Sequence, residues 1–122
     1  MVKARVGRQA LVSPAARQDI ADILLWSVEK FGDEAAARYR TLLIQAIRDI
    51  EVDPDRLGSK ARPELAKGAR TYHLACSRDN VDGQRVKTPR HFILYRSGLT
   101  GLEIARILHD SRDLRRHLPS DY

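Results

Sequence analysis

Apolar residues recur every three to four positions through two consecutive stretches in the first half of the chain. In the first stretch, residues 13–32, the periodic positions are Ala16, Ile20, Ile23, Leu24, Ser27, Val28 and Phe31. In the second stretch, residues 33–53, they are Ala36, Tyr39, Leu43, Ala46, Ile47 and Ile50. This spacing is typical of an α-helix with one apolar face, so the pattern predicts two helices that pack on a common core.

Short local signals mark the ends of both helices. Ser13 can accept hydrogen bonds from the N–H groups of the first turn, and Pro14 suits the first helical position. Gly32 is expected to end the first helix as a left-handed cap, and Asp33 is expected to cap the second. The second helix should end at Asp53, because a residue before proline avoids helical geometry. A single glycine between the helices predicts an antiparallel hairpin.

Four short apolar runs predict β-strands. One precedes the first helix and three follow a loop-like stretch at residues 54–69; the runs are residues 10–12, 70–76, 91–96 and 102–108. The run "RTYHLAC" alternates and would place Tyr72, Leu74 and Cys76 on one face. The last two runs carry apolar residues on both faces, as central strands do.

The remaining segments complete the predicted fold. Residues 77–90, with an Asp82–Gly83 turn signal, are expected to form an inserted hairpin loop, which is long for that role. Residues 111–118 predict a short C-terminal helix. The expected fold is therefore α+β: a small antiparallel sheet of three to four strands packed against an N-terminal helical hairpin. We expect a single domain over residues 1–122, with a basic lead-in at residues 1–9.

Composition narrows the class of partner. Hydrophobic residues make up 43% of the 122 residues, which is enough for one modest core. Lys and Arg total 22 against 16 acidic residues, and the formal charge of +6 favours an acidic partner, either nucleic acid or an acidic protein segment. The sequence contains no membrane-length apolar run and no secretory signal pattern. The single cysteine, Cys76, indicates a reducing, cytoplasmic setting.

Histidines on the predicted strands have more than one interpretation. His73 and His91 lie on neighbouring predicted strands and are expected to pair across the sheet, although either could act in proton transfer. His73 and Cys76 have a ligand-like spacing, but on a strand they would point to opposite faces. No second pair completes a set of four ligands, so we expect neither a zinc site nor any other cofactor.

The end of the last strand concentrates ionisable side chains. His109 is expected to hydrogen-bond the start of the C-terminal helix or to contact a target. Arg106 lies in an apolar strand and needs a carboxylate, for which Asp110 and Asp113 are the candidates.

In the order of its elements and in several short motifs, the chain resembles the ParE-type toxins of the RelE/ParE superfamily. The most specific motifs are the run Ile93–Arg96, the run Ile107–His109, Asp113 and the pair His117–Leu118. The insert at residues 77–90 departs from the family, which has a tight hairpin there. The resemblance implies neutralisation by a cognate ParD-like antitoxin with an acidic, amphipathic C-terminal tail. It implies inhibition of DNA gyrase in the ParE-like branch and ribosome-dependent mRNA cleavage in the RelE-like branch.

Choosing between the branches depends on the residues available for chemistry. Metal-independent RNA cleavage needs proton transfer and cations around the phosphate, for which the candidates are Tyr95, Arg96, Arg106 and Arg112. His91 stands where the ribonuclease branch usually has arginine, and Asp110 follows the last strand where that branch prefers basic residues. We therefore expect a toxin that acts by binding gyrase, with a RelE-like endoribonuclease as the alternative. A general RNA-binding domain is a third interpretation, although the chain has few aromatic residues for stacking.

Two sets of site residues follow from this interpretation. The target-binding set comprises His109, Arg112, Arg115 and Arg116. The antitoxin-binding set consists of apolar residues of the helical hairpin that a small sheet could not cover. Its members are Ile20, Leu24, Leu25, Trp26, Leu42 and Leu43.

Overall fold

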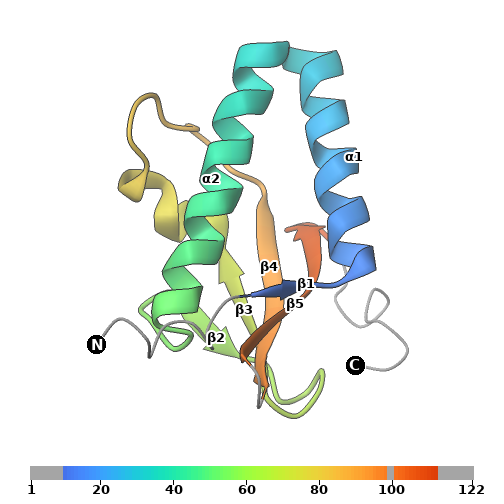
Figure 1. Ribbon diagram of the computed structural model, residues 1–122, viewed down its shortest axis with the longest axis vertical. Helices are drawn as coiled ribbons and strands as arrows, with labels where there is room; N and C mark the ends of the chain where they lie inside the picture. The colour runs from blue at the N-terminus through green and yellow to red at the C-terminus, as the bar shows by residue number, and fades with distance from the viewer. Residues whose placement is uncertain (1–9, 99–100, 113–122) are drawn as a thin grey trace.

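The computed structural model describes residues 10–98 and 101–112 (Figure 1). The helices are α1 (Pro14–Phe31), α2 (Asp33–Val52) and a 3₁₀ helix, η2 (Leu74–Asn80). The strands are β1 (Leu11–Val12), β2 (Ser59–Ala61), β3 (Ala69–His73), β4 (His91–Gly98) and β5 (Gly101–His109). The predicted C-terminal helix at residues 111–118 falls almost entirely outside the described residues.

The strands form one five-stranded sheet in the order β1-β5-β4-β3-β2. The fold class α+β is confirmed, but the sheet is mixed and larger than the predicted antiparallel sheet of three to four strands. β1 pairs with β5 in parallel, whereas the other neighbours are antiparallel. The strand missed by the sequence is β2, which lies in the stretch predicted as a loop. Its residues Ser59–Ala61 pair with Arg70–Tyr72, and such an edge strand needs only backbone hydrogen bonds on one side.

The predicted helical hairpin is confirmed. Ser13 caps α1, because its Oγ accepts a hydrogen bond from Ala16 N at 3.0 Å, and Pro14 takes the first helical position. Gly32, with a φ of 90°, joins the two helices and is also the N-cap of α2. Asp33 is therefore the first helical residue, and its prediction as the cap is wrong. α2 ends before Asp53 as predicted.

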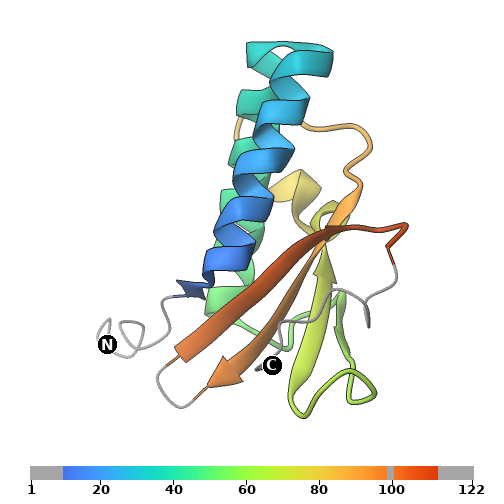
Figure 2. The same cartoon turned by 90° about the vertical axis from the view of Figure 1, so that its right-hand side faces the viewer.

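The hairpin packs on one face of the sheet (Figure 2), and its tip extends past the ends of the strands (Figures 1 and 2). The main hydrophobic core lies between these layers. It comprises Ala16, Leu42, Leu43, Ala46, Ile50, Tyr72, Leu74, Ile93, Tyr95, Leu102, Ile104 and Ile107. A smaller cluster of Ala69, Leu94 and Ala105, with Leu65 and Ala66 against it, forms separately.

The strand predicted through Cys76 ends earlier than expected. β3 stops at His73, and the chain turns directly into η2. The His73 side chain caps this turn, because its Nδ1 accepts a hydrogen bond from Ala75 N at 3.0 Å. Ser77, which the insert prediction placed in a loop, is fully buried within η2. No helix among the described residues is long and apolar enough to cross a membrane.

Candidate functional site

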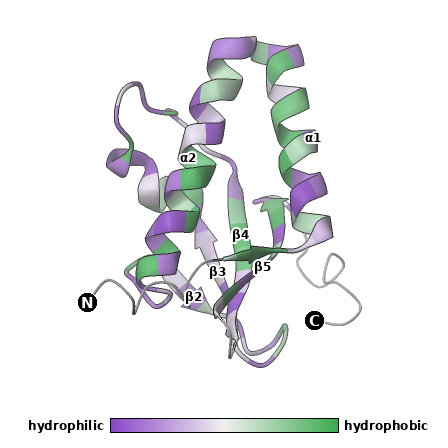
Figure 3. Ribbon diagram, in the orientation of Figure 1, coloured by the Kyte–Doolittle hydropathy of each residue, from purple (hydrophilic) through white to green (hydrophobic). Residues whose placement is uncertain are grey.

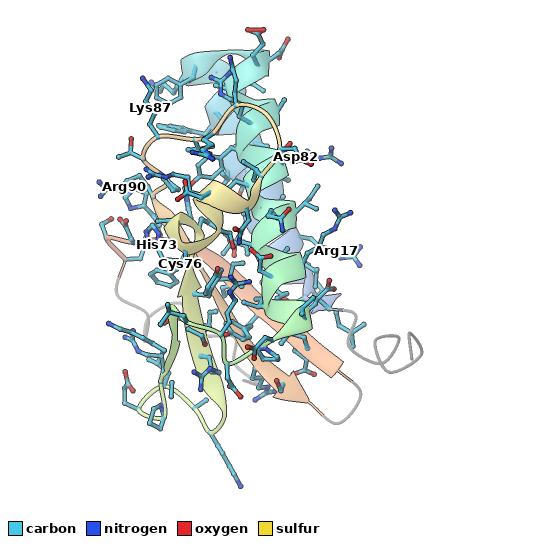
Figure 4. The ribbon with its side chains drawn as sticks, turned by 90° about the vertical axis from the view of Figure 1, so that its left-hand side faces the viewer. Arg17, His73, Cys76, Asp82, Lys87 and Arg90 are labelled. Carbon is cyan, nitrogen blue, oxygen red and sulfur yellow. The ribbon has the colours of Figure 1, made fainter. Side chains whose placement is uncertain are left out.

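Ionisable side chains collect where β3 and β5 end and β4 begins. His73, Arg90 and His109 all lie within 4 Å of the Asp110 carboxylate. His73 Nε2 is 3.1 Å from Asp110 Oδ2, and Arg90 Nη2 is 3.0 Å from Asp110 Oδ1. Asp110 N also donates to Arg90 O at 2.9 Å. In Figure 4, His73 and Arg90 lie on the same side of the molecule.

Asp110 is the centre of this arrangement. Burial opposes the ionisation of Asp110, but the hydrogen bond from His73 and the charge of Arg90 hold the pKa of its carboxyl below the ordinary value. Because His73 Nδ1 accepts from Ala75 N, a neutral His73 ring carries its proton on Nε2 and donates it to Asp110. Asp110 therefore links the ends of β3 and β5 to the residue that precedes β4.

His91 has a different environment from the other two histidines. Its Nδ1 lies 2.7 Å from the Tyr39 hydroxyl of α2, which also accepts from Arg90 N at 3.0 Å. The same hydroxyl can therefore donate its proton to a neutral His91. Burial, followed by the proximity of His109, lowers the pKa of His91 to about 4. Burial also raises the pKa of Tyr39. His91 is thus a neutral side chain that ties β4 to α2.

The predicted pairing of His73 with His91 is wrong. His73 is opposite Phe92, and His91 is opposite His109, with their ring centroids 5.3 Å apart. Cys76 is exposed and unbonded to another cysteine. Among the described residues, no group of three or more His, Cys, Asp or Glu side chains could hold a metal ion.

The predicted target-binding residues lie partly within the described chain. His109 bonds the segment that follows β5, as expected: its Nδ1 is 2.8 Å from Ser111 Oγ and accepts from Ser111 N at 3.2 Å. Arg112 is exposed, and its backbone N donates to His109 O at 3.0 Å. Arg115 and Arg116 lie outside the described residues.

Arg106 binds a carboxylate of α1 that was not among its predicted partners. Its Nε and Nη2 each donate to Asp19 of α1 at 2.8 Å. Of the two predicted partners, Asp110 instead binds His73 and Arg90, and Asp113 lies outside the described residues. The hydrogen bonds that Arg106 donates to Asp19 raise the pKa of its guanidinium. The prediction failed because α1 runs beside β5, a proximity that local sequence does not encode.

Two more residues of the alternative catalytic set, Tyr95 and Arg96, have structural partners. Tyr95 is fully buried, and its hydroxyl donates to Pro54 O at 2.5 Å and lies 2.6 Å from Ser59 Oγ. Burial raises the pKa of this hydroxyl. Arg96 Nε bonds Glu103 across the sheet at 2.9 Å. Tyr95, Arg96 and Arg106 are therefore held in three separate contacts, with Pro54, Glu103 and Asp19.

The hairpin residues predicted to bind an antitoxin divide into three groups. Leu25 and Trp26 have 60% and 51% of their surface exposed. Ile20 and Leu24 are partly buried against the core. Leu42 and Leu43 are only 1% and 2% exposed, so their assignment to an uncovered surface is wrong. They belong to the main core between the hairpin and the sheet.

Two further apolar residues of the same helix are exposed, although the sequence pattern did not predict it. Val28 and Phe31 follow the periodic stripe and were expected to face the core, but they are exposed. The helical period of apolar residues continues beyond the part of α1 that packs on the sheet. It therefore predicts which face of α1 is apolar, but not where the contact with the sheet ends. The Phe31 ring lies 5.5 Å from the Trp26 ring. Figure 3 shows that hydrophobic residues continue along α1 toward its C-terminal end.

The chain is a small α+β protein. Its helical hairpin packs on one face of a mixed five-stranded sheet, and ionisable groups gather at the strand ends. The family model described as "ParE toxin of type II toxin-antitoxin system, parDE" matches residues 10–114. The chain belongs to this family of toxins.

The comparison with solved structures agrees on the fold. A chain from the structure titled "Chromosomal ParDE TA system from P. aeruginosa" superposes with a TM-score of 0.60 and 16% sequence identity. The match covers 84% of this chain and 95% of that chain. No curated protein matches the sequence.

Proposed function

We propose that this toxin acts by binding DNA gyrase in the cytoplasm, where a cognate antitoxin neutralises it. The observation that carries the proposal is that three of the four alternative catalytic residues are held in structural contacts. Tyr95 is buried under Pro54 and Ser59, and Arg96 and Arg106 each bind a carboxylate. A ribonuclease needs its acid, its base and its phosphate-binding cations around one reacting phosphate. Residues fixed in separate contacts support a binding mechanism over cleavage.

The end of β5 is the proposed target-binding surface. His109 is partly exposed there and Arg112 is exposed, beside the Asp110 contacts that hold the strand ends together. An exposed arginine such as Arg112, next to strand ends that are held together, favours recognition of an acidic protein surface. Arg115 and Arg116 continue the same basic run in the sequence and belong to the same proposed surface.

The helical hairpin is the proposed antitoxin-binding surface. On α1 it exposes Leu25, Trp26, Val28 and Phe31. On α2, Arg40, Ile44 and Arg48 are exposed on successive turns, because residues four apart share a helix face. Neither arginine forms an ion pair with another residue of the described ranges. Apolar anchors beside arginines fit an acidic, amphipathic segment, such as the tail of a ParD-like antitoxin.

Induced expression tests the proposed mechanism. We expect DNA synthesis to stop within the first minutes while bulk mRNA stays intact. RNA ends are mapped in the same cultures, with Arg96→Ala and Arg106→Ala variants as comparisons. Fresh cuts within translated codons that disappear in these variants would instead establish the ribonuclease alternative.

A further inference from the structure

The segment between β3 and β4 follows α2 instead of projecting as a hairpin loop. Its first part, η2, is fixed to the C-terminal half of α2 by Asp49. Ser77 Oγ and Asn80 Nδ2 donate to the same Asp49 oxygen, at 2.5 and 3.0 Å. Burial opposes ionisation, but these hydrogen bonds hold the pKa of the Asp49 carboxyl below its ordinary value. A charged, fully engaged carboxylate is therefore the anchor of the segment.

The second part reaches the N-terminal half of α2. Val81 and Val86 are partly buried against the main core. Between them, Gln84 Oε1 accepts from Arg38 Nη1 at 3.1 Å. Asp49 and Arg38 are 11 residues apart, or about 16 Å along a helix with a rise of 1.5 Å per residue. We call residues 81–87 the α2 cover.

Contacts within the segment close it on itself. Arg78 Nη1 donates to Lys87 O at 2.7 Å, and Arg85 pairs with Asp79 at 3.5 Å. In Figure 1 the segment lies on the side of α2 opposite to α1. The chain thus supplies its own layer on one flank of the hairpin.

The exposed apolar surface of the hairpin is correspondingly uneven. α1 exposes Leu25, Trp26, Val28 and Phe31, each by 40% or more. In the middle of α2 the large exposed hydrophobic residue is Ile44, which is 37% exposed. Apolar surface of this kind marks a binding site when it is contiguous. The uncovered part of the hairpin is its α1 side and the Arg40–Arg48 line, not the flank beneath the α2 cover.

We propose that the α2 cover is a specificity element that confines the antitoxin to the α1 side of the hairpin. The inference rests on the proposed function, since the occupant is the acidic, amphipathic antitoxin segment favoured by Arg40, Arg48 and the +6 charge. An antitoxin that needs the α2 flank would overlap Val81 and Val86, and would have to remove them from the core. Overlap of this kind excludes a wrong partner without adding contacts to the right one.

Hydroxyl-radical footprinting of the complex with the protein encoded by the adjacent gene tests the proposal. We expect Trp26 and Phe31 to lose reactivity on binding, while Val81 and Val86 react as in the toxin alone. A change in either direction at Val81 and Val86 overturns the inference, because the antitoxin then displaces the cover or sits on it. If the neighbouring protein does not bind at all, the proposed function fails as well.

A double variant tests whether the α2 cover itself confines the antitoxin to the α1 side of the hairpin. Val81→Asp with Val86→Asp detaches the cover, and Val81→Ser with Val86→Ser is the milder replacement if the first variant does not fold. We expect the footprint on the detached variant to extend to Arg38 of α2, which the cover contacts through Gln84. The matched control is Asp82→Asn, which changes an exposed residue of the cover and should keep the wild-type footprint. An unchanged footprint on the detached variant shows that the cover confines nothing.

Discussion

Asp19 of α1 binds Arg106 of β5 through both carboxylate oxygens, and the oxygen that accepts from Arg106 Nε also accepts from the backbone N of Ile107 at 2.9 Å. β1 covers β5 only at Glu103 and Ile104. Ser13 extends this coverage, because its N donates to Ile104 O and its Oγ to Ala105 O. The Asp19 side chain therefore accepts a hydrogen bond from the backbone of β5 beyond the point where β1 ends. This carboxylate thus joins α1 of the helical hairpin to β5 of the sheet.

Replacing this carboxylate should weaken the fold. We expect Asp19→Asn to lower the free energy of unfolding by about 2–3 kcal/mol, because Arg106 would lose its counter-charge in a largely buried site. Urea unfolding measures the change. Asp22→Asn on the exposed side of the same helix is the control and should cost less than about 0.5 kcal/mol. Equal losses in the two variants would mean that the Asp19 contacts add nothing to the hairpin's attachment.

His91 should make the toxin less stable in mild acid. A histidine in an unfolded chain has a pKa near 6.5, whereas burial lowers the pKa of His91 in the folded state to about 4. The unfolded chain therefore takes up the proton first as the pH falls. The contribution of His91 is complete above about pH 6.5 and is lost progressively down to about pH 4.

Unfolding by urea at pH 7.5 and at pH 5 checks this prediction. We expect the wild type to lose about 1–2 kcal/mol more than His91→Gln over this range, after allowance for the partial exposure of the ring. The comparison between variants removes the contributions of all ionisable groups that both proteins share. Identical pH dependence in the two proteins would mean that His91 titrates normally in the folded state.

Core and surface residues of the hairpin should respond differently to truncation. Leu43→Ala should lower the free energy of unfolding by about 2–5 kcal/mol, because Leu43 is buried between α2 and the sheet. Trp26→Ala should cost less than about 1 kcal/mol in stability but weaken antitoxin binding by about tenfold or more. Thermal unfolding and titration calorimetry measure the two effects. An antitoxin affinity unchanged by Trp26→Ala would remove α1 from the proposed interface.

Removal of residues 111–122 should separate toxicity from neutralisation. The shortened chain keeps Asp110 and therefore the contacts with His73 and Arg90 that hold the strand ends. It lacks Arg112, Arg115 and Arg116 of the proposed target-binding surface. We expect it to fold and to bind the antitoxin within about tenfold of the wild type, or 1.4 kcal/mol, yet to leave growth unaffected. Growth arrest by the shortened toxin would place the target contact elsewhere.

The sequence predicted the hairpin well because its signals are local. The Ser13 cap, Pro14 and the 3.6-residue period act within a few positions, and the structure keeps them. β2 escaped prediction because "SKA" has no apolar pattern, and its backbone pairing with β3 leaves no signal in the local sequence.

The sequence showed which ionisable residues could form the site, but it did not show which residues they contact. Asp19 and Arg106 are 87 residues apart, and Asp110 meets His73 across 37 residues. Contacts at such separations depend on which elements lie side by side, and no local pattern encodes that. The same holds for His91, which lies opposite His109 of β5, whereas His73 of β3 lies opposite Phe92.

The most direct measurement of the central claim is a supercoiling assay with purified gyrase and purified toxin. We expect the toxin to inhibit supercoiling, and the antitoxin to restore it when added in equal amount. The shortened chain that lacks residues 111–122 should leave gyrase active, while Tyr95→Phe should inhibit as the wild type does. Full gyrase activity in the presence of folded toxin, together with cleavage of mRNA on translating ribosomes, would contradict the account.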